Sequence, residues 1–190
     1  MSGDGLQRLG TLLREQGGLM ATLLAPAGSP GDDDGGSAGS PASVAAGGPR
    51  AAGRREEYEL LVEAIYEGYL LHYGCPRVLR APEADLGVLA GDQLYAIGLA
   101  RLVALGDTQA VAELADTITL TALAHGARER GLAEAVWAAG ARAVGWGSSE
   151  VHRRAKDLAF AGAPDAIEAM RTSAAAVPAA SERATSVPGP

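Results

Sequence analysis

Residues 86–105 constrain the fold most, because they form an almost wholly apolar stretch with a single acid, Asp92, in its interior. Its length and lack of turn signals predict one long helix. A buried carboxylate is costly unless it is paired. We therefore expect Asp92 to be a buried structural acid, bonded to a backbone group or to an arginine such as Arg101 or Arg128.

Glycines within and just after this stretch predict how the helix packs and where it ends. Gly87, Gly91 and Gly98 are separated by four and seven residues, which places them near one face. Each costs about 1 kcal/mol relative to alanine in a helix interior. We therefore expect them to permit a close helix crossing. Gly106 predicts the helix end, and Asp107 the cap of the next helix.

The composition favours a protein built only from helices. Hydrophobic residues make up 47% of the 190-residue chain, much of that alanine, and aromatic residues only 4%. Alanine has the best helix propensity, and the period-two alternation typical of strands is missing. The sequence therefore predicts an all-α helical bundle.

Charge and cysteine content limit the partners and the compartment. The net charge is −7, which argues against binding nucleic acid or anionic membranes. The only cysteine is Cys75, so no internal disulfide is possible. We see neither a signal peptide nor a membrane span of ~18 apolar residues. Together with the single lysine, Lys156, among many arginines, these features predict a cytoplasmic bacterial protein.

The chain divides into four parts. Residues 1–24 predict an amphipathic helix. It either docks on the main domain, the favoured alternative, or is a tethered helix that binds a partner or a membrane surface. Residues 25–53, rich in Ala, Gly, Ser and Pro, predict a disordered linker. Residues 54–173 predict the helical domain. Residues 174–190 predict a disordered tail.

Within the domain, helices are expected at 54–73, 82–105, 108–130 and 131–144, followed by a last helix capped by Ser148 or Ser149 and split by Pro164.

Candidates for metal chemistry are sparse. Glu63 and Glu67 lie one helical turn apart and could chelate a divalent cation, but a solvated acidic face is the favoured interpretation. His72 and Cys75 fall short of the four ligands that structural zinc requires. The acidic triplet 32–34 lies in a glycine-rich coil with no rigid frame. We therefore predict no catalytic residue, no metal and no cofactor.

Arginines near the cysteine leave two further alternatives. Arg77 and Arg80 could lower the pKa of Cys75, or could hold an anion together with Arg101. We favour an inert thiol and solvated surface arginines.

The segment Leu89-Ala-Gly-Asp-Gln-Leu-Tyr-Ala96, with Gly106-Asp107 at the following turn, resembles a helix of the trans-polyprenyl diphosphate synthases, which reads Leu-Ala-Gly-Asp-x-Leu-x-Ala. The resemblance spans about residues 58–130. It implies part of that family's all-α fold and a structural role for Gly91, Asp92, Gly106 and Asp107.

The family binds magnesium through two aspartate-rich motifs, and this sequence carries neither; Glu63-Ala-Ile-Tyr-Glu67 stands where the first is expected. The resemblance therefore implies a non-catalytic accessory subunit that binds a larger prenyltransferase-like chain or associates with itself. A stand-alone helical interaction or scaffold protein is the alternative. A third possibility is a small enzyme that uses Glu63, Glu67 and His72.

Overall fold

The computed structural model describes residues 3–25 and 39–176, which fold as an all-α protein, as the sequence predicts. In these ranges the only β-type pairing is one antiparallel bridge between Leu24 and Leu79. The helices are α1 (Gly3–Gln16), α2 (Gly18–Thr22), α3 (Pro41–Gly47), the short 3-10 helix η1 (Pro49–Ala51), α4 (Arg55–Tyr73), α5 (Ala84–Ala104), α6 (Thr108–Gly126), α7 (Arg130–Trp146), α8 (Glu150–Phe160) and α9 (Ala166–Ala175).

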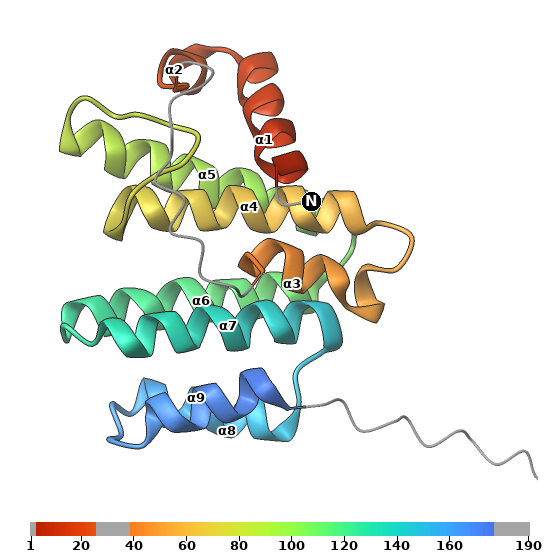
Figure 1. The fold of residues 1–190 in the computed structure, drawn as a ribbon, viewed down its shortest axis with the longest axis vertical. Coiled ribbons are helices and arrows are strands. Elements are labelled where there is room, and N and C mark those ends of the chain that lie inside the picture. The colour runs from red at the N-terminus through yellow and green to blue at the C-terminus, as the bar shows by residue number, and fades with distance from the viewer. Residues whose placement is uncertain (1–2, 26–38, 177–190) are drawn as a thin grey trace, which may run out of the picture.

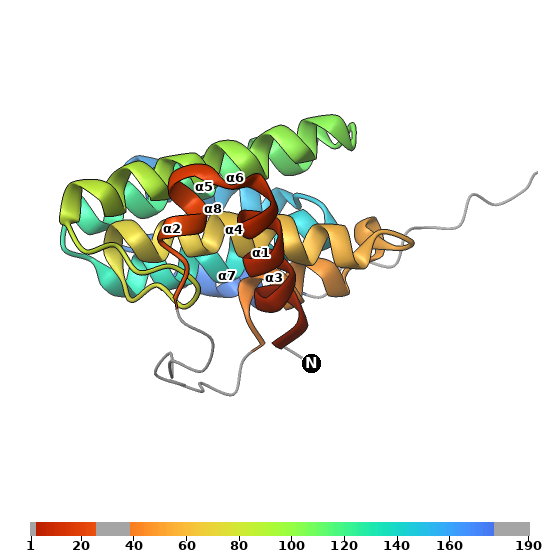
Figure 2. The same ribbon diagram turned by 90° about the horizontal axis from the view of Figure 1, so that it is seen from above.

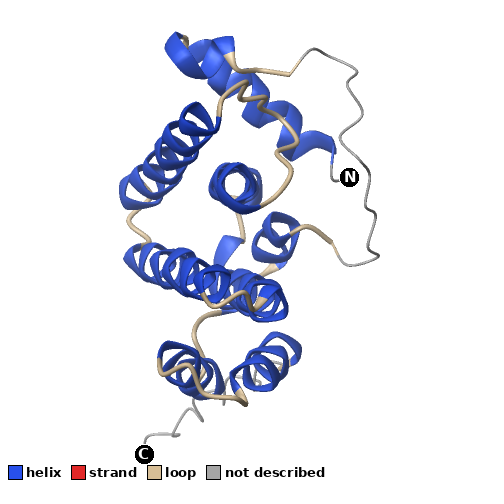
Figure 3. Cartoon of the chain, turned by 90° about the vertical axis from the view of Figure 1, so that its left-hand side faces the viewer, coloured by secondary structure: helices blue, strands red, loops and turns tan. Residues whose placement is uncertain are grey.

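The helices stack in tiers, which Figure 1 shows from the front and Figure 3 from the side. The pair α4–α5 lies below α1 and α2. The pair α6–α7 forms the next tier, with α3 packed against both α4 and α7, and α8–α9 form the last. The pairs α4–α5, α6–α7 and α8–α9 each pack as helical hairpins. A short turn joins α6 to α7, and the loop 74–83 joins α4 to α5.

The core follows the same order. Its central cluster is built from α4, α6 and α7 around Tyr58, Ile65, Leu114, Trp137 and Val144. A second cluster joins α6 and α7 to α8 and α9, and a third joins α1 and α2 to α4 and α5. Because α4 and α5 contribute to the central and third clusters, and α6 and α7 to the central and second, the described helices form one continuous domain.

The first helix docks on the domain, which is the favoured of its two predicted roles. Leu9, Leu12 and Leu13 of α1 are buried against α4 and α5. Figure 2 shows α1 crossing over these helices. Arg8 reaches Glu59 of α4 at 3.4 Å. The apolar stripe of this segment is therefore used inside the domain.

The predicted linker 25–53 is wrong for residues 39–53. Part of this segment forms α3 and η1, and Ala42, Ala45 and Ala46 are buried in the central cluster. Small side chains allow the close approach: a Cβ on Gly48 would lie 2.1 Å from the carbonyl oxygen of Gly145. Residues 26–38, including the acidic triplet, lie outside the described residues, as does the predicted tail beyond residue 176.

Local signals for α3 were present in the sequence. Ser40 is its N-cap and accepts a hydrogen bond from the backbone N–H of Ser43, and Pro41 occupies the first turn. A capping serine followed by proline is a typical helix start. The loop-like composition of the segment hid this signal.

The predicted boundaries of the later helices are close to those observed. Gly106 ends α5 with a φ of 76°, and Asp107 caps α6 by accepting from the N–H of Ala110 at 3.0 Å. Ser149 caps α8. The helix predicted around Pro164 is split into α8 and α9, because proline cannot donate a helical hydrogen bond.

Candidate functional site

Glycines form the contact between α4 and α5, as the sequence predicts. A Cβ on Gly91 would lie 3.0 Å from the carbonyl oxygen of Gly68. A Cβ on Gly98 would lie 2.4 Å from Cγ1 of Ile65. The two backbones therefore approach too closely for larger side chains, and Gly91 has a packing role.

The prediction that Asp92 is a buried acid is wrong. Its side chain is 65% exposed, and its ion-pair candidate is the Nε2 atom of His72 at 3.2 Å, not Arg101 or Arg128. The helical period explains the difference. Gly91 faces α4, and the next residue along the helix turns toward the uncovered side of α5. Asp92 therefore needs no buried partner.

Asp107 does more than cap α6. Its carboxylate accepts from Nη2 of Arg50 at 2.6 Å and from the hydroxyl of Tyr58. Burial alone would raise the pKa of Asp107, but the bonds from Tyr58, the Ala110 N–H and Arg50 outweigh it and lower that pKa. Asp107 thereby ties η1 and α4 to the start of α6, which is a structural role.

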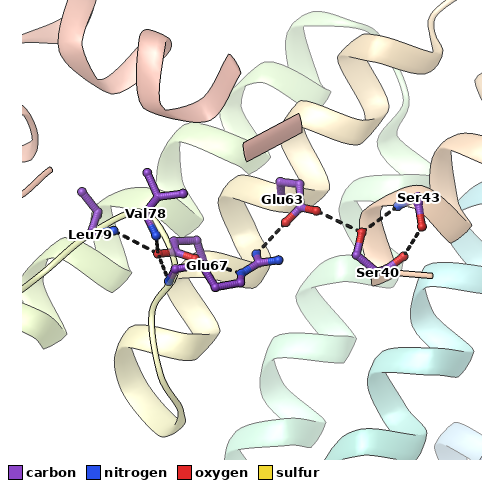
Figure 4. A network of polar contacts seen from close by, with 7 residues as sticks. Ser40, Ser43, Glu63, Glu67, Val78 and Leu79 are labelled. Carbon is purple, nitrogen blue, oxygen red and sulfur yellow. Dashed lines mark hydrogen bonds and ion pairs between the residues drawn. The ribbon is translucent and has the colours of Figure 1, made fainter. Parts of the chain in front are cut away.

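The solvated acidic face predicted for Glu63 and Glu67 is wrong, because these residues are only 1% and 0% exposed. Figure 4 shows both side chains on α4, bonded to the segments around them. One Glu67 oxygen accepts from the backbone N–H groups of residues 77, 78 and 79 at 2.7, 2.6 and 3.1 Å. Its other oxygen lies 3.3 Å from Nε of Arg77.

Glu63 completes this network. It accepts from Nη2 of Arg77 at 2.6 Å and from the hydroxyl of Ser40 at 3.0 Å. The two acids therefore anchor the loop after α4 and the start of α3. Because these bonds engage all four carboxylate oxygens, the pair is not arranged as an open cation site.

The same network accounts for Arg77, which the sequence offered as a cysteine activator or an anion ligand. Arg80 donates to the backbone oxygens of Pro76 and Leu79, and Cys75 is exposed. Among the residues that the structure describes, no group of three or more His, Cys, Asp and Glu side chains is placed to hold a metal ion.

An aromatic row lines one side of α4. Tyr66, Tyr69 and Tyr73 follow one another along the helix, and His125 of α6 stacks on Tyr73 with ring centres 4.2 Å apart. The Tyr69 hydroxyl lies 3.0 Å from Nε2 of His125, and burial raises the pKa of Tyr69 to about 12. Trp137 packs edge-on against Tyr66. His125 is therefore a packing residue of this row.

A second buried polar network joins α6, α8 and α9. Nδ1 of His152 lies 2.8 Å from Oγ of Ser173, and Nε2 lies 3.0 Å from a Glu113 oxygen. Lys156 donates to the same oxygen at 2.9 Å and to Asp116 at 2.7 Å. Burial alone would raise the pKa of Glu113, but the bonds from His152 and Lys156 hold it at about 2.

The order of hydroxyl, imidazole and carboxylate in this network is that of a catalytic triad. Two features point instead to a structural role. Lys156 neutralises the carboxylate that would otherwise stabilise a charged imidazole, and both His152 and Ser173 are only 4% exposed. The sequence did not indicate this network, since its members lie up to 60 residues apart, at positions 113 and 173.

The outer side of α5 is an unusual surface for a core helix. Leu89 and Val103 are 58% and 57% exposed, and Val88 is 46% exposed. Ala96 is also exposed and lies midway between Leu89 and Val103. Because these three positions are seven residues apart, they follow one line along the helix. We call Val88, Leu89, Ala96 and Val103 the α5 outer face.

α5 is also the one helix in the described ranges long and apolar enough to cross a membrane by length and composition. A core helix of a soluble protein passes the same test. Here the glycine side of α5 packs closely on α4, and 33% of the apolar window is buried.

No protein-family model, no curated protein and no solved structure matches this chain. The relationship to the polyprenyl synthases that residues 89–96 suggest therefore stays a prediction. The candidate functional surface is assigned from geometry alone, and the α5 outer face is the strongest one.

Proposed function

We propose that this chain is a non-catalytic helical subunit that binds a partner protein through the α5 outer face. The expected partner is the larger catalytic chain of a polyprenyl diphosphate synthase-like enzyme. The observation that supports the proposal most strongly is the line of exposed apolar side chains on a helix whose opposite side is fully packed.

The spacing of the α5 outer face suits a helical partner. Leu89 and Val103 stand roughly 21 Å apart along the axis, at 1.5 Å per residue. The seam by which two helices pack side by side uses two apolar positions in every seven residues. The line of Leu89, Ala96 and Val103 supplies one of these two positions. Contiguous exposed apolar surface is a feature of protein-binding sites, and the exposed Val88 and Leu89 are neighbours on this face.

The buried acids support a non-catalytic role. In the position where the resembled family places its first aspartate-rich motif, Glu63 and Glu67 bind the chain's own backbone and Arg77. Magnesium-assisted transfer of a diphosphate needs carboxylates free to coordinate the metal. Both acids are committed to holding a loop, which argues against the small-enzyme alternative.

The choice of partner rests on the likeness of residues 89–96 to the family helix. Of this segment, Leu89 and Ala96 belong to the α5 outer face. In this role we expect a cytoplasmic bacterial protein, in keeping with its single, exposed thiol. A stand-alone interaction protein would use the same face for an unrelated partner or for a second copy of this chain.

Light scattering coupled to size-exclusion chromatography tests the proposal. The purified chain is mixed with a catalytic prenyl synthase chain from the same genome that carries both aspartate-rich motifs. We expect a stable complex, which the double variant Leu89→Glu/Val103→Glu abolishes. Phe160→Glu on α8 is the matched control, since Phe160 is also an exposed apolar residue, at 46%, and it should leave the complex intact.

Failure of the wild-type chain to form this complex would overturn the assignment as an accessory subunit. A complex that survives the double variant would overturn the assignment of the face. A dimer of the chain alone, lost in the double variant, would favour the stand-alone alternative.

A further inference from the structure

A cavity of about 530 Å³ opens where α7 ends and α8 begins. Side chains from η1, α6, α7, α8 and α9 contribute to its walls, among them Arg50, Gln109, Arg142, Trp146 and Ser148. Its volume falls within the range of roughly 300–1,000 Å³ typical of small-molecule sites. The α7, α8 and α9 helices that line it belong to the two tiers farthest from α1 and α2 (Figure 1), and none of its lining residues belongs to α5.

Arg142 gives this cavity an unbalanced positive charge. Its guanidinium carbon lies 4.0 Å from the centre of the Trp146 ring, and Nη2 donates to the backbone oxygen of Ala176 at 3.0 Å. Within residues 3–25 and 39–176, no carboxylate lies within ion-pair distance of Arg142. A half-buried cation without a counter-ion favours an anionic ligand.

Arg50 also lines the cavity and is held in place. Nη2 bonds Asp107 and Nη1 bonds Gln109, both at 2.6 Å. Its Nε atom, like Oγ of Ser148, is buried without a hydrogen-bond partner in the described part of the chain. Because Asp107 balances its charge, Arg50 contributes a fixed N–H donor and not a free charge. A donor already held in place lowers the entropic cost of binding.

The start of α8 adds to the positive electrostatic potential of the cavity. Residues 148–151 line the cavity, and the side chain of Ser149 caps the helix at His152. The first N–H groups of a helix carry partial positive charge. The acid at this edge, Glu150, is turned to Arg153 and Arg154 at 2.6 and 3.2 Å. It is therefore neutralised by its own helix.

Much of the remaining lining is apolar. It includes Ala139, Ala143 and the Trp146 ring, together with the hydrogen-bonded His152–Ser173 pair. A bare phosphate ion is far smaller than the cavity and would leave these walls uncovered. A ligand that fits both the arginines and the apolar lining is an oxyanion attached to an apolar body.

We propose that this cavity binds a small organic phosphate or carboxylate. Its oxyanion lies between Arg142, Arg50 and the start of α8, and its apolar body lies against Trp146. This site is independent of the partner surface on α5, so it gives the protein a ligand-binding function beyond the one proposed above.

Isothermal titration of the full chain with phenyl phosphate, benzoate, inorganic phosphate and benzyl alcohol tests the site. We expect saturable binding of phenyl phosphate or benzoate, and the tighter of the two identifies the oxyanion. Benzyl alcohol and inorganic phosphate should each bind at least about tenfold more weakly, since each lacks one half of the recognised chemistry. Quenching of Trp146 fluorescence should follow the same titration.

Variants then assign the residues. Arg142→Gln should weaken binding about tenfold or more, and Arg142→Lys, which keeps the charge but not the planar fork, should weaken it less. Arg14→Gln removes the same unit charge from an exposed position on α1 and should leave binding unchanged. Circular dichroism of each variant checks that the fold is intact.

Three results would overturn the proposal. The first is the absence of saturable binding of phenyl phosphate and benzoate up to about 10 mM, a concentration that corresponds to an affinity too weak for a built site. The second is equal binding by folded Arg142→Gln and wild type. The third is binding of benzyl alcohol or inorganic phosphate as tightly as the aromatic anions.

Discussion

Two neighbouring helices each depart from the usual rule that apolar residues are buried and charged residues exposed. On α4, the acids Glu63 and Glu67 are buried; on α5, Leu89 and Val103 are exposed. The buried acids are fully bonded to Arg77, Ser40 and backbone N–H groups.

The exposed residues of α5 have no such compensation within the described chain. This difference distinguishes residues with a structural role from residues that indicate a binding surface. Buried acids that the chain itself supplies with hydrogen-bond donors have a structural role. Exposed apolar side chains that the chain leaves uncovered indicate a partner protein. Each prediction below tests one side of this contrast.

The largest expected effect comes from removing a buried acid. Glu67→Ala leaves the loop N–H groups and Arg77 without their acceptor, and breaking a buried ion pair in this way costs about 3–5 kcal/mol. Urea unfolding followed by circular dichroism measures the change. Glu57→Ala, at an exposed position of the same helix, should change the free energy of unfolding by less than about 0.5 kcal/mol. A similar small loss for Glu67→Ala would show that its bonds are not structural.

The second buried network predicts a pH dependence. The pKa of Glu113 in the folded chain is about 2, below its ordinary value of 4.5. Its bonds therefore contribute fully above pH 4.5, and the contribution is lost as the pH falls toward 2. A shift of this size corresponds to up to about 3 kcal/mol.

Unfolding free energies of wild type and Glu113→Gln, measured at several pH values between 7 and 2.5, test this dependence. The variant should be less stable at pH 7 and should lose less stability on acidification. Parallel curves for the two proteins would contradict a structural role for this network.

The packed side of α5 should resist even a methyl group. Gly98→Ala places a Cβ 2.4 Å from Ile65 and 3.1 Å from the Leu61 carbonyl oxygen. We expect a loss of about 1–3 kcal/mol from overpacking, despite the better helix propensity of alanine. Gly126→Ala, which meets no atom within 4 Å, is the control and should be neutral or stabilising. Stabilisation by Gly98→Ala would contradict the close crossing.

The exposed side of the same helix should show the smallest effect on stability. Leu89→Glu and Val103→Glu remove no core contact, so each should change the unfolding free energy by less than about 0.5 kcal/mol. Thermal unfolding of the isolated chain measures this. A loss above about 2 kcal/mol would mean that these residues pack within the domain and are not available to a partner.

Sequence patterns predicted the helices better than the site. Local rules of capping, propensity and spacing predict the all-α class, the Gly106–Asp107 turn, the split at Pro164 and the close crossing of α4 and α5 at glycines. The structure shows each of them. Helix α3 was missed because tertiary contacts of its alanines, not its overall composition, decide its state.

The errors at Asp92, Glu63 and Glu67 share one cause. Helical periodicity shows which residues lie on the same face, but not which faces the rest of the chain covers. Asp92 is exposed because α5 is covered only on its glycine side, and Glu67 is buried because a loop ten residues later folds over it. The cavity around Arg142 likewise joins segments distant in sequence, so no local motif indicated it.

Hydrogen–deuterium exchange on the complex with the catalytic prenyl synthase chain tests the central claim most directly. If the α5 outer face binds the partner, amides of residues 84–104 exchange more slowly in the complex than in the free chain. Those of α8, residues 150–160, stay unchanged. Protection of α8 and α9 with no change in α5 would contradict the claim.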